Sequence, residues 1–305
     1  MERAAPPAAL PDDPLAAAPG VVPSSPGPLD RLPPQALFVL GAMSQYVGAA
    51  LAVLLFEKVP AAGVAWLRVV ASAIVLVAWR RPWHTSWTVA RLRLVAAFGL
   101  ALAFMNVTFY LAIDRLPLGT AVAIEFVGPI AVAALGSRTR RDGLALVLAF
   151  AGVLALADVH LTGSPGGFAL AVAAGVMWAA YIVLGHRVAA DSQLRAQDGL
   201  ALAMAIGAVA LAPFLVVSAV PALVDPLLLA ACLAVGVASS VVPYGLEQVA
   251  MRRLPRARFA LLLALLPATA TIIGAIVLGQ VPGLLESAGI ALVVTAASLR
   301  SHADF

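Results

Sequence analysis

One carboxyl group stands inside an apolar stretch where charge is costly. Glu125 lies midway along a hydrophobic segment, four residues before Pro129. An ionised side chain at the centre of a bilayer costs at least ~2.5 kcal/mol on insertion scales, so it usually faces a cavity or a partner. Pro129 has no amide proton, and the carbonyl oxygen of Glu125 therefore loses its helical donor. Such a carboxyl group suits binding of a substrate ammonium group or a proton; the alternative is a protonated carboxyl satisfied within the bundle.

Two other charged residues lie in or near apolar stretches. Arg68 falls within the segment 62–79, where it could snorkel to the membrane edge or pair with Glu125 or a substrate carboxylate. Glu247 lies about one turn from the end of a later segment, close to Arg253. A surface ion pair is the simpler interpretation of Glu247, and a gate is the alternative.

Uncharged polar residues complete the candidate site. Trp178 and Tyr181 are three residues apart and share a helical face, in a place corresponding to Gln45 and Tyr46 near the start of the chain. Taken singly, such residues more often form hydrogen bonds between helices, but as a set they favour a wet cavity. The predicted substrate-binding residues are Glu125, Asn106, Tyr110, Trp178, Tyr181 and Tyr244. Glu125 is also the predicted proton-coupling residue, Arg68 and Glu247 are predicted to gate or form ion pairs, and Pro129 and Pro267 are predicted to kink their helices.

The elements that position these residues must lie in lipid. The chain has 305 residues, of which 63% are hydrophobic and only 11% charged, with a mean hydropathy of +1.01. A soluble domain is nearer half apolar and a quarter charged, so an ordinary soluble enzyme is excluded. Pro, Gly and charged residues divide the apolar mass into ten stretches of near membrane-spanning length. These all-α polytopic spans are expected at 35–56, 62–79, 94–113, 116–136, 143–158, 167–185, 199–220, 226–250, 257–279 and 283–299.

The distribution of basic residues predicts the orientation of these spans. Sixteen of the 19 lysines and arginines fall in the tails and loops on one side, and only Lys58 and Arg115 fall on the other. Cytoplasmic loops carry this excess of positive charge, so both termini are expected in the cytoplasm. The basic residues thus report topology and give no reason to expect nucleic-acid binding.

The sequence also contains an internal repeat at a separation of 138 residues. Arg115-Leu116-Pro117 matches Arg253-Leu254-Pro255, and Pro129 matches Pro267 at the same separation. Each repeat holds five spans, an odd number, so the two halves are expected to insert with opposite orientation, as in many secondary transporters. The predicted organisation is a disordered Pro/Ala-rich cytoplasmic tail at 1–34 and two five-helix repeats at 35–158 and 167–300.

Signatures of other chemistry are missing from the sequence. Cys232 is the single cysteine, and the four histidines show no metal-ligand spacing with other residues. There is no phosphate-binding loop for ATP and no nucleophile elbow. The sequence therefore predicts no enzyme, cofactor or metal site, and a solute or proton gradient as the energy source.

Several motifs resemble those of EamA-type transporters in the drug/metabolite transporter superfamily, most closely the bacterial threonine/homoserine exporters. The resemblance spans about residues 36–300 and is carried by Asn106–Ile113, Pro117–Pro129, Gly175–Ile182, Pro243–Glu247 and Arg253–Pro255. It implies an inner-membrane exporter of small amino acids, working by proton antiport and alternating access. The family often has a glutamate before the proline of span nine and a Gly-Glu at its end, where this chain has Leu266 and Gly279-Gln280. On this interpretation the second half lacks these two carboxylates, and coupling leans more heavily on Glu125.

Alternatives remain open at the level of sequence. The chain could export or import another metabolite or a cationic drug, or act as a non-transporting scaffold or sensor. The expected partners are a small-molecule substrate and the lipid bilayer, and a homodimer is left open.

Overall fold

A computed structural model describes residues 32–136, 140–160, 164–191, 194, 196–254 and 262–301. Contacts divide the chain into Met1–Pro33 and a second unit, Pro34–Phe305, which contains every helix named below. Among the described residues, six helices are long and apolar enough to cross a membrane, and four shorter apolar helices accompany them. This fits the ten spans expected from the sequence. The predicted tail at 1–34 lies almost entirely outside the described residues.

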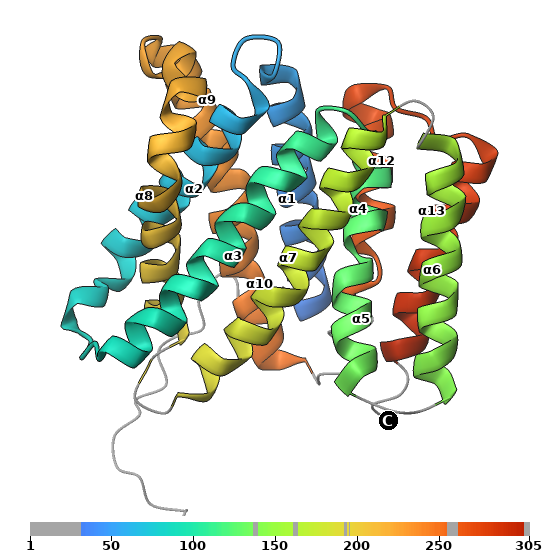
Figure 1. The fold of residues 1–305 in the computed structure, drawn as a ribbon, viewed down its shortest axis with the longest axis horizontal. Coiled ribbons are helices and arrows are strands. Elements are labelled where there is room, and N and C mark those ends of the chain that lie inside the picture. Colours follow the sequence, from blue (N-terminus) through green and yellow to red (C-terminus); the bar gives the residue numbers. More distant parts are fainter. Residues whose placement is uncertain are drawn as a thin grey trace, which may run out of the picture. The chain divides into compact units, whose positions relative to one another are not determined.

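The helices of the described chain are shown in sequence order in Figure 1. The first seven elements are α1 (Pro34–Leu55), α2 (Ala61–Arg80), the 3-10 turn η2 (Pro82–His84), α3 (Val89–Ile113), α4 (Leu118–Glu125), α5 (Val127–Gly136) and α6 (Arg140–His160). The others are α7 (Pro165–Ala190), α8 (Ala196–Leu223), α9 (Pro226–Gly236), the π-helical turn η3 (Val237–Val241), α10 (Val242–Arg253), α12 (Leu266–Leu278) and α13 (Leu284–Ser301).

Several ends differ from the expected bounds. Helix α3 begins five residues before position 94 because the Thr88 hydroxyl caps it, accepting the Arg91 amide. The expected span 116–136 is two helices, since α4 ends at Glu125 and α5 begins at Val127. Of the expected span 257–279, α12 covers Leu266–Leu278, and 255–261, including Pro255 of the repeat motif, lies outside the described residues.

Two prolines explain the irregular turns near the candidate site. Pro129 lacks the amide that would bond the carbonyl of Glu125, and the helix is interrupted one residue after Glu125, at Phe126. Pro243 likewise cannot donate to the carbonyl of Ser239, and the chain forms the π-turn η3 there, closed by the Val242 amide on the Val237 oxygen. Each turn leaves a backbone oxygen available to another element.

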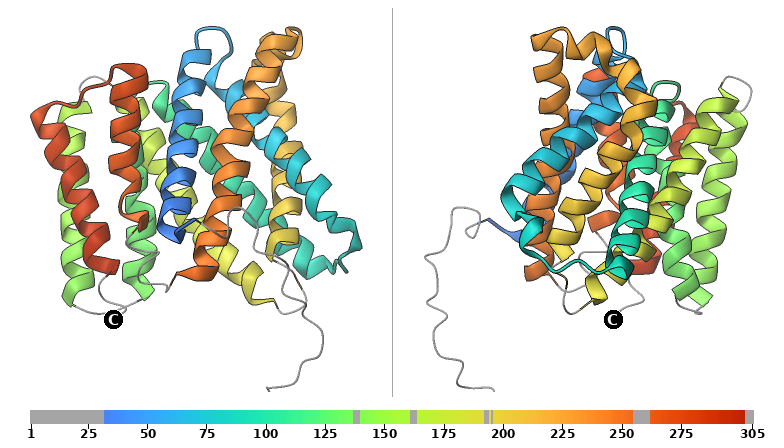
Figure 2. Two further views of the ribbon diagram at one scale, coloured as in Figure 1. Left: turned by 180° about the vertical axis from the view of Figure 1, so that it is seen from behind. Right: turned by 60° about the vertical axis from the view of Figure 1, so that its left-hand side comes forward.

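Long-range packing joins helices from the two halves of the sequence. Such pairs include α2 with α8, α6 with α13, α3 with α7, α3 with α8, α1 with α10, α1 with α12 and α4 with α12 (Figures 1 and 2). Small residues allow some backbones to approach closely: a Cβ added to Gly63 would lie 2.3 Å from the oxygen of Ser218, and one added to Gly99 2.2 Å from that of Ala203. Such positions fix how α2 and α3 lie against α8.

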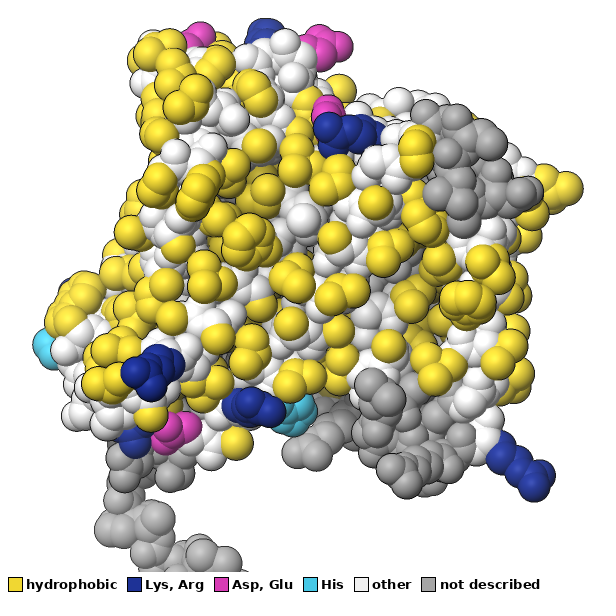
Figure 3. Space-filling model, in the orientation of Figure 1, with side chains coloured by type: hydrophobic (Ala, Val, Ile, Leu, Met, Phe, Trp, Pro, Cys, Tyr) yellow, Lys and Arg dark blue, Asp and Glu magenta, His cyan; other side chains and the backbone are white. Residues whose placement is uncertain are grey.

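The outside of the bundle is apolar along its middle and charged toward its ends (Figure 3). Val209, Phe214 and Ile276 expose most of their side chains, which suits contact with lipid. At the end where α2 finishes, Arg80 pairs with Asp198 at 3.0 Å and Arg91 pairs with Asp191 at 2.8 Å. The charged residues therefore tie the connection between α2 and α3 to the ends of α7 and α8.

Candidate functional site: a polar pocket inside the bundle

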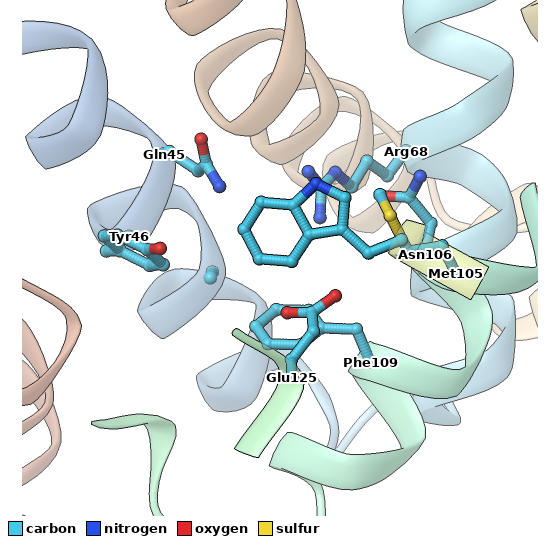
Figure 4. A pocket seen from close by; sticks show the side chains of 9 residues that line it. Gln45, Tyr46, Arg68, Met105, Asn106, Phe109 and Glu125 are labelled. Carbon is cyan, nitrogen blue, oxygen red and sulfur yellow. The ribbon is translucent and has the colours of Figure 1, made fainter. Parts of the chain in front are cut away.

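A small polar pocket lies between α1, α2, α3, α4 and α7. Its volume is about 50 Å³, room for only a few water molecules. The side chains that line it come from positions far apart in the sequence and include both an acid and a base (Figure 4). The lining residues are Gln45, Tyr46, Ala49, Arg68, Met105, Asn106, Phe109, Glu125 and Trp178.

Glu125 forms one side of this pocket. It is the last residue of α4, a helix whose residues are all buried, and it is only 6% exposed. Within the described residues its carboxyl group has neither a hydrogen-bond nor an ion-pair partner, and in Figure 4 it points into the pocket. A buried carboxyl group without a protein partner is poised to take a proton or a cationic group of a ligand.

Arg68 lines the same pocket and is held by η3. Its Nε donates to Ser240 Oγ at 2.9 Å, and its Nη2 donates to the Ser239 carbonyl oxygen at 3.0 Å, the oxygen that Pro243 leaves without a helical donor. The side chain is 7% exposed, so it does not extend to the membrane edge. The guanidinium group lies over the ring of Tyr110, 5.1 Å from its centroid. This fork keeps a positive charge in a fixed orientation beside the pocket.

Asn106 and two neighbours on α3 supply the wall next to Arg68. The Asn106 amide nitrogen donates to the Leu102 carbonyl oxygen at 2.8 Å within the same helix. Its side-chain oxygen is therefore the atom available to accept a hydrogen from a ligand. Met105 and Phe109 were not predicted, although Phe109 lies three residues beyond Asn106 and so shares its face. Trp178 of α7 also lines the pocket and meets Phe126 edge to face, with ring centroids 5.4 Å apart.

The other predicted binding residues have different surroundings. Tyr110 is buried beneath Arg68, and its hydroxyl has no hydrogen-bond partner in the described structure. Tyr181 stacks on Phe98, with centroids 5.1 Å apart, and Tyr244 packs beside an apolar cluster that includes Met204. None of these three tyrosines lines the pocket, so a direct contact with substrate is not part of their geometry here.

Two predicted residues remain, Glu247 and Pro267. The side chain of Glu247 in α10 lies outside the described side chains. Pro267 stands in the first turn of α12, immediately after the turn at Ala264 and Leu265. Among the described residues, no group of three His, Cys, Asp or Glu side chains is arranged to hold a metal ion.

The sequence interpretation missed a second buried acid. Glu286 lies in the first turn of α13, is 8% exposed and accepts a hydrogen bond from the Thr120 hydroxyl of α4. The second half thus contains a buried carboxyl group, although Leu266 and Gln280 stand where the family often has glutamate. The sequence gives no signal for its burial, because it lies close to a span end, where an acid normally reaches water.

Comparison with known proteins assigns the family. The threonine/homoserine exporter RhtA of Salmonella typhimurium is 37% identical over 265 residues, covering 84% of this chain and 88% of its own length. RhtA of Escherichia coli K12 is 36% identical over the same share. The model of the EamA-like transporter family matches residues 165–301. The chain belongs to the EamA-like transporter family.

A solved crystal structure shares the fold of this EamA-like transporter. It covers 88% of this chain and 98% of its own, with a TM-score of 0.55 at 19% sequence identity. The family match covers α7 to α13 and thus contains Trp178 but no other lining residue of the pocket. The charged groups of the pocket, Arg68 and Glu125, both come from the first half of this EamA-like chain, where the similarity to the two exporters extends the match.

Proposed function

We propose that this chain exports small amino acids such as threonine and homoserine, in exchange for protons. The observation that carries the proposal is a single pocket holding an unpartnered carboxyl group, Glu125, and an oriented guanidinium group, Arg68. An amino acid bears one ammonium and one carboxylate group, so it can satisfy both charges at once. The similarity to proteins named threonine/homoserine exporters supports the same class of substrate.

The side-chain oxygen of Asn106 suits the hydroxyl group that distinguishes these amino acids. It faces a pocket whose larger apolar lining residues are Met105, Phe109 and Trp178, and these favour a short aliphatic chain. A cationic drug is a poorer fit because a buried guanidinium group repels it. Transport therefore explains the polar groups better than a purely structural or sensory role does.

Proton coupling follows from the single acid in the pocket. Glu125 can hold either a proton or the ammonium group of a substrate, but not both, and this competition exchanges one for the other. The pocket volume of about 50 Å³ is too small for an amino acid together with its contacts, so binding requires the surrounding helices to separate. Alternating separation toward each side of the membrane would move substrate outward and protons inward.

Several features support two inverted repeats. If each span of the first half is exchanged with the span at the same place in the second half, the pattern of packed helices stays the same. The pairs α2–α8, α4–α12 and α6–α13 are unchanged by this exchange, and the pair α1–α10 becomes the pair α3–α7. The start of α1 and the end of α13 lie at the same end of the bundle (Figures 1 and 2). Together with the basic loops, this supports a bacterial inner-membrane protein with both termini in the cytoplasm.

Transport by inverted membrane vesicles tests the function. With the interior made acidic, vesicles containing the chain should accumulate labelled threonine, and unlabelled homoserine should compete. A protonophore should abolish the accumulation, and a cationic dye should not compete. Accumulation no greater than in vesicles lacking the chain would reject the proposal for these substrates.

Arg68→Lys tests the orientation of the substrate. Lysine keeps the positive charge but cannot form the fork to Ser239 and Ser240, so the substrate carboxylate loses an oriented partner. Loss of one charged hydrogen bond, about 1.5–3 kcal/mol, should raise the KM for threonine roughly tenfold or more, with a smaller effect on the maximal rate. The exposed Arg93→Lys is the matched control and should leave KM unchanged. An unchanged KM in Arg68→Lys would separate Arg68 from substrate binding.

A further inference from the structure

The end of α4 farther from the pocket is held by residues of the second half. Pro117 precedes this helix and provides no side-chain cap, so its first amides need acceptors from elsewhere. The Leu118 amide donates to Gln280 Oε1 at 2.9 Å, and the Thr120 hydroxyl donates to Glu286 Oε1. Gln280, in the connection between α12 and α13, thus does for α4 what a local capping residue usually does.

The site around Glu286 is packed rather than open. Thr120, Gln280 and Glu286 line a cavity of about 10 Å³, which has room for about one water molecule. The second carboxylate oxygen accepts the Gly283 amide at 3.3 Å, which fixes the side chain against its own helix start. A negative group beside the first turn of α4 is also favoured by the helix dipole. This arrangement suits a structural contact between the halves and leaves no room for an amino acid.

The held end and the substrate pocket are two ends of one short helix. Thr120 and Glu125 are five residues apart, about 7.5 Å along the helix axis. Pro129 removes one hydrogen bond from the turn that follows Glu125, so α4 is joined to α5 less firmly there than in an unbroken helix. A displacement at Thr120 is therefore transmitted directly to the Glu125 carboxyl group.

We propose that Gln280 and Glu286 form a latch that holds the outer end of α4 and so positions Glu125, and that this latch releases when the pocket opens to the outside. The proposal rests on the transport function inferred above, and it makes both second-half residues positioning residues rather than substrate ligands. Release exchanges the Thr120–Glu286 hydrogen bond for hydrogen bonds to water, so the cost is small enough for a repeated cycle.

Labelling of an introduced cysteine tests the latch without reference to a substrate. Cys232 is the single native cysteine and is fully buried, so Cys232→Ala gives a clean background. In that background Gln45→Cys places a thiol at the pocket, and a membrane-impermeant maleimide added to spheroplasts reports its access from outside. Adding Glu286→Leu, which removes the acceptor, or Thr120→Val, which removes the donor, should raise the labelling rate about tenfold, equivalent to about 1.4 kcal/mol.

The double change and a matched control make the result decisive. Thr120→Val with Glu286→Leu should label no faster than Glu286→Leu alone, because both changes remove the same contact. Thr295→Val alters a threonine of α13 that bonds only within its helix, and it should leave the rate unchanged. Unchanged labelling in the two latch variants, or an effect that adds in the double variant, would overturn the proposal. Failure of threonine transport would leave this labelling result standing, so the two proposals fail separately.

Discussion

Glu125→Gln is expected to abolish proton-driven uptake of threonine into inverted vesicles. Glutamine keeps the size of the side chain but can neither take up a proton nor pair with an ammonium group. Losing a buried charge partner costs about 2 kcal/mol or more, so uptake should fall at least about 30-fold. Initial rates under an imposed pH gradient, normalised to the amount of folded protein, measure the effect.

The control for this experiment makes the same substitution outside the pocket. Glu57→Gln changes an exposed glutamate between α1 and α2 and should leave the rate as in the wild type. Glu125→Asp, which keeps the acid but shortens its reach, should retain part of the activity. Gradient-driven uptake that persists in Glu125→Gln would refute an obligatory proton-carrying role for this residue.

Among single substitutions of glycine by alanine near the site, Gly128→Ala is expected to disrupt helix packing most. A Cβ at this position in α5 would lie 2.0 Å from the Gly175 carbonyl oxygen and 2.7 Å from the carbonyl carbon, so the α7 backbone must move. Overpacking of this kind costs about 1–3 kcal/mol. The Gly175 position is itself close to the backbone of Glu125, so the shift also displaces the acid. The variant should show a lower melting midpoint in detergent and reduced transport.

Gly245→Ala provides the matched comparison. A Cβ there meets nothing within 4 Å, and alanine is the better helix former by roughly 1 kcal/mol, so this variant should be at least as stable as the wild type. Equal melting midpoints for the two variants would show that α5 and α7 do not pack as closely as described.

Much of the pocket could be predicted because polar and charged residues are rare inside membrane-spanning segments. An acid, a base and an amide within apolar segments are conspicuous, and Glu125, Arg68 and Asn106 do line one pocket. Helix periodicity could also have added Phe109, which repeats the face of Asn106 one turn later. Met105 could not be predicted as a lining residue, because a methionine in an apolar helix is usually packed in the core or faces lipid.

The surroundings of the other residues could not be predicted, because helix periodicity does not show which residues of different helices come into contact. Tyr181 shares a face with Trp178, but Phe98 supplies a stacking partner for its ring, and it packs there instead of at the pocket. Glu286 meets Thr120 across 166 residues of sequence, a contact set by how α13 lies against α4. Periodicity can thus assign a residue to a helical face without identifying the neighbour that occupies that face.

The π-turn η3 has a consequence for how a substrate is oriented. It holds one more residue than an α-helical turn, so α10 is rotated by about 100° relative to a plain continuation of α9. Asn106 and Tyr244 are separated by the repeat distance of 138 residues, yet Asn106 lines the pocket and Tyr244 packs away from it. Apart from Trp178, the second half acts on this pocket through Ser239 and Ser240, which hold Arg68. A polar molecule bound between Glu125 and Arg68 would therefore have one allowed direction, and it would keep that direction whichever side of the membrane the pocket faces.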